Sequence, residues 1–209
     1  MYEGEYLKGE RWSGKGKEYY SNSKIKYEGE YLNDKRNGKG KEYYYNGELQ
    51  YEGEYLNDMR HGKGKVYYSN GKLQYEAEYL NDKKCGKGKE FYDNNQLKYE
   101  GEYSDDKRHG KGKEFYDNGQ LKYEGEYFNG KMNGKGKEYY YDGSIMFEGE
   151  YLNGERWNGK GRDFIYDDKF QRFEFIGEYL NGKKFGKRRK YNYSGELIFE
   201  DKYSEGEKK

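Results

Sequence analysis

The sequence predicts an all-β fold: an elongated, single-layer antiparallel β-meander of tandem β-hairpin repeats, twisted and curved. Three observations lead to this prediction. A block close to Tyr-Glu-Gly-Glu-Tyr-Leu-Asn returns along almost the whole chain, short segments alternate in character between turn residues, and the 209 residues include no proline. A fixed return interval indicates a repeat architecture, and a chain without proline suits an unbroken hydrogen-bonded ladder.

The repeats define one array over residues 1–209. Every step from Tyr27 to Phe147 is 24 residues, an irregular insertion occupies 163–174, and a partial capping repeat with a tail occupies 199–209. The copies begin near residues 2, 27, 51, 75, 99, 123, 147 and 175. A chain made almost entirely of repeats leaves no room for a separate catalytic domain, so we expect no enzymatic activity.

The composition favours order although it is very polar. Charged residues make up 39% of the chain, a value typical of disordered proteins. However, the 30 tyrosines and 10 phenylalanines recur at fixed phases of the repeat. Because each aromatic side chain buries a large area, such a chain can fold with few aliphatic residues.

One repeat, residues 27–50, is predicted to contain two strands and two turns. Residues 27–32 alternate with a period of two, as a half-buried strand does, and 33–37 form a polar turn. Residues 38–45 form the second strand, and Asn46-Gly47 is a typical hairpin turn because both residue types tolerate positive φ. Connections this short make neighbouring strands antiparallel.

Charge pairing predicts a strand register. Opposite charges directly across two strands stabilise a sheet by roughly 0.2–1 kcal/mol per pair. The predicted facing pairs are Glu28–Lys41 and Glu30–Lys39 within the repeat, and Lys41–Glu54 and Tyr43–Glu52 toward the next one.

The opposite face of the predicted sheet combines tyrosine with glycine. In the repeat analysed it carries Tyr27, Gly29, Tyr31, Gly38, Gly40 and Tyr44. Glycine weakens a strand interior, so we expect tyrosine rings to lie across the glycines and compensate. Ala77 replaces the first glycine in one copy, and we expect a methyl group to be tolerated there.

With these residues, the repeat resembles the MORN repeat (membrane occupation and recognition nexus). The resemblance rests on the Tyr-Glu-Gly-Glu-Tyr block, the following Asn-Gly or Asn-Asp, the Gly-Lys-Gly pair and the closing Asn-Gly or Asp-Gly turn, and it covers about residues 2–203. The longer turn at 70–73 is similar to a variant form of the repeat. The resemblance implies a β-hairpin array that binds proteins or membranes, with catalysis, where present in the family, in another domain.

The aromatic ladder on the charged face is the first candidate site, with another protein as its partner. Its members recur once per repeat beside lysine and glutamate residues, and stacking of rings within the sheet is the alternative role. They are Tyr19, Tyr43, Tyr67, Phe91, Phe115 and Tyr139.

A basic cluster near the end of the chain is the second candidate site. It could bind anionic phospholipid headgroups, or it could be a solvated capping hairpin. Its residues are Lys183, Lys184, Lys187, Arg188, Arg189 and Lys190.

Other partners follow from weaker signals. Self-association through unpaired terminal strands, as in a self-assembling structural protein, is one further alternative. An antitoxin-like role, by family analogy alone, is another. Binding of nucleic acid is not expected, because 41 Lys and Arg balance 40 Asp and Glu. With one cysteine and no visible signal peptide, we expect a cytoplasmic protein, with membrane or cytoskeletal association as an alternative.

No cofactor or metal is expected. The Gly-Lys-Gly segments lack the Lys-Ser/Thr of a phosphate loop and open no helix. His61, Cys85 and His109 share one phase of the repeat. Successive members would then lie roughly 10 Å apart, too far to share one metal ion.

Overall fold

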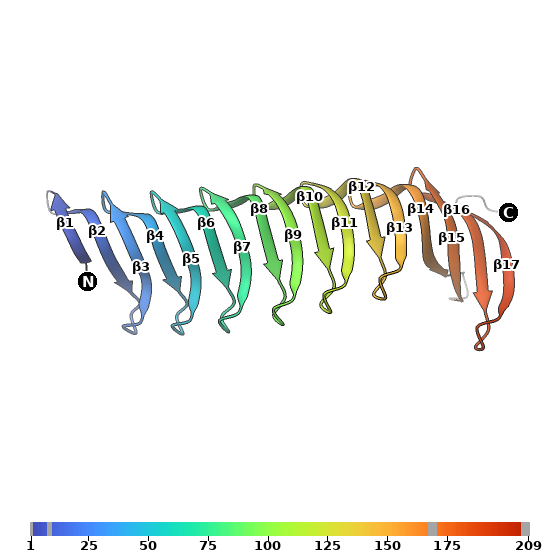
Figure 1. The fold of residues 1–209 in the computed structure, drawn as a ribbon, viewed down its shortest axis with the longest axis horizontal. Helices are drawn as coiled ribbons and strands as arrows, with labels where there is room; N and C mark the ends of the chain where they lie inside the picture. Colours follow the sequence, from blue (N-terminus) through green and yellow to red (C-terminus); the bar gives the residue numbers. More distant parts are fainter. Residues whose placement is uncertain (1, 8–9, 167–170, 206–209) are drawn as a thin grey trace. The chain divides into compact units, whose positions relative to one another are not determined.

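The computed structural model describes residues 2–7, 10–166 and 171–205, and side chains from Trp12 onward. These residues form antiparallel strands joined by short turns, with no helix among them. The predicted single-layer β-meander is therefore confirmed (Figure 1). Its predicted elongation, twist and curvature stay predictions.

By internal contacts the chain divides into two units. The first comprises residues up to Arg108 with Asp117–Gly119. Its strands pair in chain order. They are β1 (Tyr2–Leu7), β2 (Glu10–Tyr19), β3 (Ile25–Leu32), β4 (Lys35–Tyr43), β5 (Leu49–Leu56), β6 (Met59–Tyr67), β7 (Leu73–Leu80), β8 (Lys83–Phe91) and β9 (Leu97–Ser104).

The second unit comprises His109–Tyr116 and the residues from Gln120 onward. It contains most of β10 and the strands that follow, again paired in chain order. They are β10 (Lys107–Phe115), β11 (Leu121–Phe128), β12 (Lys131–Tyr139), β13 (Ile145–Leu152), β14 (Glu155–Tyr166), β15 (Arg172–Leu180), β16 (Lys183–Tyr191) and β17 (Leu197–Ser204).

The register within a repeat agrees with the prediction at one pair and departs from it at the other. Glu28 faces Lys41 and Gly29 faces Gly40. Beyond them a β-bulge replaces the predicted pair of Glu30 with Lys39. Gly38, at φ +88°, occupies the bulge, and a Cβ added there would meet the Glu30 side chain rather than a tyrosine. The bulge needs a positive φ that glycine adopts without strain.

The predicted register toward the next repeat was wrong by two residues at Lys41 and, beyond a β-bulge, by three at Tyr43. Lys41 faces Glu52, and Tyr43 faces Leu49. The connection is tighter than expected, because the Tyr44 and Gly47 amides close it by donating to the carbonyls of Glu48 and Tyr44. The observed register still places each such lysine between two glutamates.

The core consists of tyrosine rings lying on glycine pairs, as predicted. Tyr27 is fully buried, and a Cβ added to Gly29 or Gly40 would lie 2.7 Å from its Cζ atom. Tyr51 covers Gly53 and Gly64 in the same way. Each such ring also meets a second tyrosine edge to face, 5.6 Å away for Tyr31 against Tyr27. We call this side of the sheet the tyrosine face.

Ala77 shows what a methyl group does at a glycine position. A Cβ on the facing Gly88 would meet the Ala77 methyl and Tyr103, and no atom of Tyr75 is among its nearest neighbours. Tyr75 is half-buried, whereas Tyr51 and Tyr99 at the same phase are fully buried. The methyl group is therefore tolerated at this position as expected, but no methyl-sized gap beneath the Tyr75 ring accommodates it.

A layer of arginine and glutamate covers the tyrosine rings of the first unit. The Arg36 guanidinium lies 4.1 Å from the Tyr27 ring centroid, and that of Arg60 lies 4.3 Å from the Tyr51 centroid. Glu42 accepts hydrogen bonds from both arginines, at 2.7 and 2.6 Å. Each carboxylate thus joins two repeats while the cations stack on π-faces.

Turn residues also tie each repeat to the next. The Tyr20 hydroxyl donates to the carbonyl of Tyr43 at 2.7 Å, and Tyr44 donates to the carbonyl of Tyr67 at 2.8 Å. At the opposite turns, the Arg36 amide donates to the Asp58 carboxylate at 2.8 Å. These hydrogen bonds fix the spacing between hairpins.

The insertion at 163–174 lengthens a hairpin. β14 and β15 stay paired as far as Tyr166 and Arg172. Phe173 and Phe175 are buried, and the buried Glu174 accepts from Arg162 and from the Tyr191 hydroxyl. Residues 167–170 within the predicted insertion, and 206–209 of the predicted tail, lie outside the described residues.

We expect Gly53→Ala to lower the free energy of unfolding by about 1–3 kcal/mol, because the new methyl group overlaps the Tyr51 ring and must displace it. Urea unfolding followed by far-ultraviolet circular dichroism measures the change. The reciprocal Ala77→Gly is the control. Its shift should stay below about 1 kcal/mol, since the better burial of Tyr75 is offset by the entropy of glycine. Unfolding of Gly53→Ala at the wild-type urea concentration would contradict the ring-on-glycine core.

Glu90 generates a prediction about pH. Its buried carboxylate accepts from the Tyr103 hydroxyl at 2.6 Å and from Arg108 at 3.2 Å. Burial opposes ionisation, but these two donors outweigh it, so the pKa of Glu90 lies below its ordinary value. The resulting stabilisation is complete above the unfolded-state pKa of about 4.3 and is lost as pH falls through the folded-state pKa.

We therefore expect Glu90→Gln to lose about 1–3 kcal/mol at neutral pH, and to lose less further stability than the wild type on acidification. Thermal unfolding at a series of pH values provides the measurement. Glu48→Gln, at an exposed glutamate in the turn after β4, is the matched control. Parallel pH profiles for Glu90→Gln and the wild type would argue against this role.

Candidate functional site

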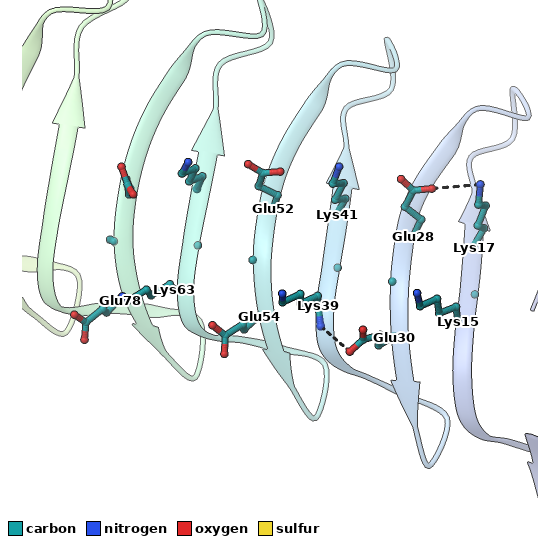
Figure 2. Close-up of a pocket in the computed structure, with 18 of the residues that line it drawn as sticks. Lys15, Lys17, Glu28, Glu30, Lys39, Lys41, Glu52, Glu54, Lys63 and Glu78 are labelled. Atoms are coloured by element: carbon teal, nitrogen blue, oxygen red, sulfur yellow. Dashed lines mark hydrogen bonds and ion pairs between the residues drawn. The ribbon is translucent and has the colours of Figure 1, made fainter. Parts of the chain in front are cut away.

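The face opposite the tyrosines carries two rows of alternating lysine and glutamate side chains. Figure 2 shows them in the first unit, with a strip free of side chains between the rows. The first row consists of Lys17, Glu28, Lys41, Glu52, Lys65 and Glu76. The second row consists of Lys15, Glu30, Lys39, Glu54, Lys63, Glu78 and Lys87.

The two rows border a groove of about 970 Å³. Its floor is backbone, because the residues between the rows are glycines, with Ala77 as the exception, and their missing side chains would point to the tyrosine face. Strands β2, β4 and β6 each contribute two lysines to the groove and β8 contributes Lys87, whereas β3, β5 and β7 each contribute two glutamates. The groove is therefore crossed by positive and negative stripes in strict alternation.

In the first row, Glu28 and Glu52 each accept a hydrogen bond from a tyrosine hydroxyl. Glu28 accepts from the Tyr43 hydroxyl at 2.6 Å and pairs with Lys17 at 3.3 Å. The hydrogen bond from Tyr43 is the main reason that the pKa of Glu28 lies below its ordinary value. Tyr139 makes the same contact in the second unit, where it donates to Glu124. Burial and this hydrogen bond raise the pKa of Tyr139 to about 12, so its hydroxyl remains protonated and can donate at physiological pH.

The predicted aromatic ladder lies beside this row, but only in part within the groove. Tyr19 lines the groove and is half exposed. Tyr43 and Tyr67 are half-buried and donate to the first-row carboxylates of Glu28 and Glu52. In the second unit the half-buried Tyr139 donates to Glu124 in the same way, whereas Phe91 and Phe115 lack the hydroxyl. The tyrosine hydroxyls of the ladder thus hold first-row glutamate side chains in place. Binding of a partner by the rings of the ladder stays a prediction.

In the second row the carboxylates turn toward the bulges. Glu30 accepts from the backbone amide of Lys39 at 3.1 Å. The Glu54 and Glu78 carboxylates lie against Gly62 and Gly86. The structure records no ion pair for the ammonium groups of Lys39, Lys63 and Lys87 within its described residues. The second row therefore presents one lysine ammonium group per repeat that is available to pair with an anionic group of a ligand.

The predicted basic cluster is largely paired with acidic or amide groups. Arg188 forms a bidentate contact with Asp201, with distances of 2.6 and 3.0 Å. Lys187 and Arg189 both bind Glu200, Lys184 binds Asp163, and Lys190 donates to Gln171, whereas Lys183 is exposed at the start of β16. The headgroup interpretation stays a prediction, and these pairings reduce the positive charge available for it.

His61 and Cys85, which share one phase of the repeat, face Glu54 and Glu78 across their hairpins. Within the described ranges, no cluster of three or more His, Cys, Asp or Glu is arranged to hold a metal ion. Those same ranges contain no helix capable of crossing a bilayer.

The sequence pointed to this aromatic and charged face as the interaction surface, but only its aromatic ladder was named as the site, and its lysines and glutamates served only to set the register. The signal was present, because two lysines flanking a glycine lie on one face of a strand, and so do the two glutamates of Glu-Gly-Glu. The Arg–Glu layer over the tyrosines was also missed, although Arg36, Arg60 and Arg108 recur at one phase.

We expect Tyr43→Phe to raise the pKa of Glu28 toward its ordinary value, because the variant removes the main hydrogen bond that favours the carboxylate. The lost bond should also cost about 1 kcal/mol of stability. Titration of the side-chain carboxyl by NMR measures the pKa. Tyr45→Phe, at an exposed ring in the neighbouring turn, serves as the control. An unchanged Glu28 titration would show that Tyr43 does not hold the row.

Comparison with known families gives a consistent answer. The MORN repeat model matches residues 27–48, 51–72, 99–121 and 123–145, and the MORN repeat variant model matches residues 12–33 and 84–105. A search of the curated proteins returned no match. MORN repeats are commonly protein or membrane interaction modules and are not known as a catalytic family. Because the matched segments together cover more than half of the sequence, and the structure repeats the same hairpin, the chain belongs to the MORN repeat family.

Proposed function

We propose that this chain is a non-catalytic scaffold that binds another protein in the groove of its charged face. The observation that carries the proposal is the groove itself, a backbone floor between two rows of charged side chains. A long groove in which every repeat offers the same contacts suits a long, thin ligand. The affinity for such a ligand would be the sum of many small contacts, one set from each repeat, just as the stability of a repeat protein is a sum over its repeats.

The charge pattern favours a protein over a polyanion. Nucleic acid and anionic membranes present a surface of one sign, and their affinity comes from neutralising that charge with Lys and Arg. Here each lysine stripe lies between glutamate stripes about 4.8 Å away, so a uniform negative surface meets repulsion as often as attraction. Proteins, in contrast, can place charges of both signs at chosen intervals.

Selection from a random peptide display library tests this proposal without assuming a ligand conformation. We expect the wild-type chain to enrich peptides whose affinity falls about tenfold or more, equivalent to about 1.4 kcal/mol, in the double variant Lys41→Glu with Lys65→Glu. This double change turns two positive stripes of the first row negative. The matched control is Lys35→Glu with Lys83→Glu, which alters exposed lysines at the starts of β4 and β8.

Circular dichroism of both variants establishes that the array is still folded. Equal binding of the enriched peptides to the wild type and the groove variant would place the binding surface elsewhere. Failure to enrich any peptide, together with binding to phosphatidylserine vesicles that is lost in Arg188→Glu, would favour the membrane alternative over the scaffold.

A further inference from the structure

The period of the groove restricts the shape of what can bind along it. The second row repeats its lysines at Lys15, Lys39, Lys63 and Lys87, one per two-stranded repeat. Strands lie about 4.8 Å apart, so these lysines recur about every 9.6 Å. A ligand that contacts several of them in the same way must present equivalent side chains at nearly this interval.

Polyproline II is the regular backbone conformation that fits this interval. It has three residues per turn and a rise of about 3.1 Å per residue, so every third side chain returns to the same side after about 9.3 Å. An α-helix returns a side chain to one face after seven residues, or about 10.5 Å. Over three repeats the mismatch is about 1 Å for polyproline II and nearly 3 Å for the helix. A β-strand repeats one face about every 6.7 Å and does not match.

The floor of the groove also favours such a segment. Neighbouring strands already pair through their backbones across the floor, for example at Gly40 with Gly53 and Gly53 with Gly64. A chain that crosses the strands therefore finds no free ladder to extend. Polyproline II needs no backbone hydrogen bonds of its own, and proline-rich segments dock on aromatic-lined grooves. The half-exposed Tyr19 lines one border of this groove.

The sign of the ligand's charge follows from the second row. Its glutamates are turned to the bulges, where Glu30 accepts from a backbone amide and Glu54 and Glu78 lie against glycines. For the ammonium groups of Lys39, Lys63 and Lys87 the structure records no ion pair among the residues it describes. Carboxylates on the ligand are the groups that would complete this row.

We propose, on the basis of the scaffold function above, that the groove binds a proline-rich segment of another protein in the polyproline II conformation, with Glu or Asp at every third position. One column of its side chains lies toward the second-row lysines, a second packs beside the first row, and the third faces solvent. The acidic spacing, rather than the total charge, provides the specificity.

Two labelled peptides of identical composition test the spacing. The first is six copies of Pro-Pro-Glu, and the second is three copies of Pro-Glu-Pro-Pro-Pro-Glu, whose glutamates are alternately four and two residues apart. By fluorescence anisotropy at low salt we expect the first to bind at least about tenfold more tightly, and its affinity to fall as salt screens the ion pairs. Equal affinities would overturn the proposal, as would tighter binding of six copies of Pro-Pro-Lys.

Variants of the chain locate the binding. The triple change Lys39→Gln, Lys63→Gln and Lys87→Gln should abolish the preference for the regular spacing. Lys35→Gln, Lys83→Gln and Lys107→Gln, at exposed strand starts, remove the same charge and should preserve it. A preference that survives the second-row changes would overturn the proposal. So would tighter binding of a helical peptide with glutamate at every seventh residue.

Other outcomes separate this inference from the scaffold function. Groove-dependent peptides from the display selection that lack the three-residue acidic spacing would leave the scaffold standing and reject the ligand proposed here. A dimer in light scattering that dissociates in the second-row triple variant, without binding of Pro-Pro-Glu, would assign the groove to a second copy of the chain and reject it as well. Absence of any groove-dependent ligand would reject both.

Discussion

The contact of a tyrosine ring with two facing glycines is the constraint on which the rest of the structure depends. A single-layer sheet has no second layer to bury its side chains, so it must supply its own core on one face. Tyr51 does this by lying directly on Gly53 and Gly64, where any Cβ would collide with the ring. The entropic cost of glycine in a strand is offset by the burial of a large aromatic side chain.

The same glycines shape the other face. Successive side chains of a strand point to opposite faces, so the lysines and glutamates on either side of each glycine point to the charged face. They form two rows there, and the glycine backbone leaves a strip free of side chains between the rows (Figure 2). The packing requirement of one face thus creates the groove on the other. Substitutions that change the glycines will therefore affect stability and the groove together.

Much of this architecture could be predicted from the sequence, since period, strand faces and ring-on-glycine packing all follow from local pattern. The register toward the next repeat could not, because it depends on a turn closed by backbone hydrogen bonds of Tyr44 and on a bulge beside Tyr43. Charge pairing alone allowed two solutions, Lys41 against Glu52 or against Glu54. The displacement of Tyr75 by Ala77 could not be predicted from the sequence either, because the sequence does not show that the space beneath the ring is already filled.

One length governs both the assembly and the recognition. Each repeat advances the array by two strands, so the tyrosines, the Arg–Glu bridges and the second-row lysines all recur at the same interval of about 9.6 Å. A binding partner does not have to match a unique pocket, because it gains one equivalent contact for each repeat it spans. Its own periodicity then decides the outcome, since a small mismatch per repeat accumulates until favourable charges face unfavourable ones. Specificity in such a groove is a property of spacing along the ligand, and it sharpens as more repeats take part.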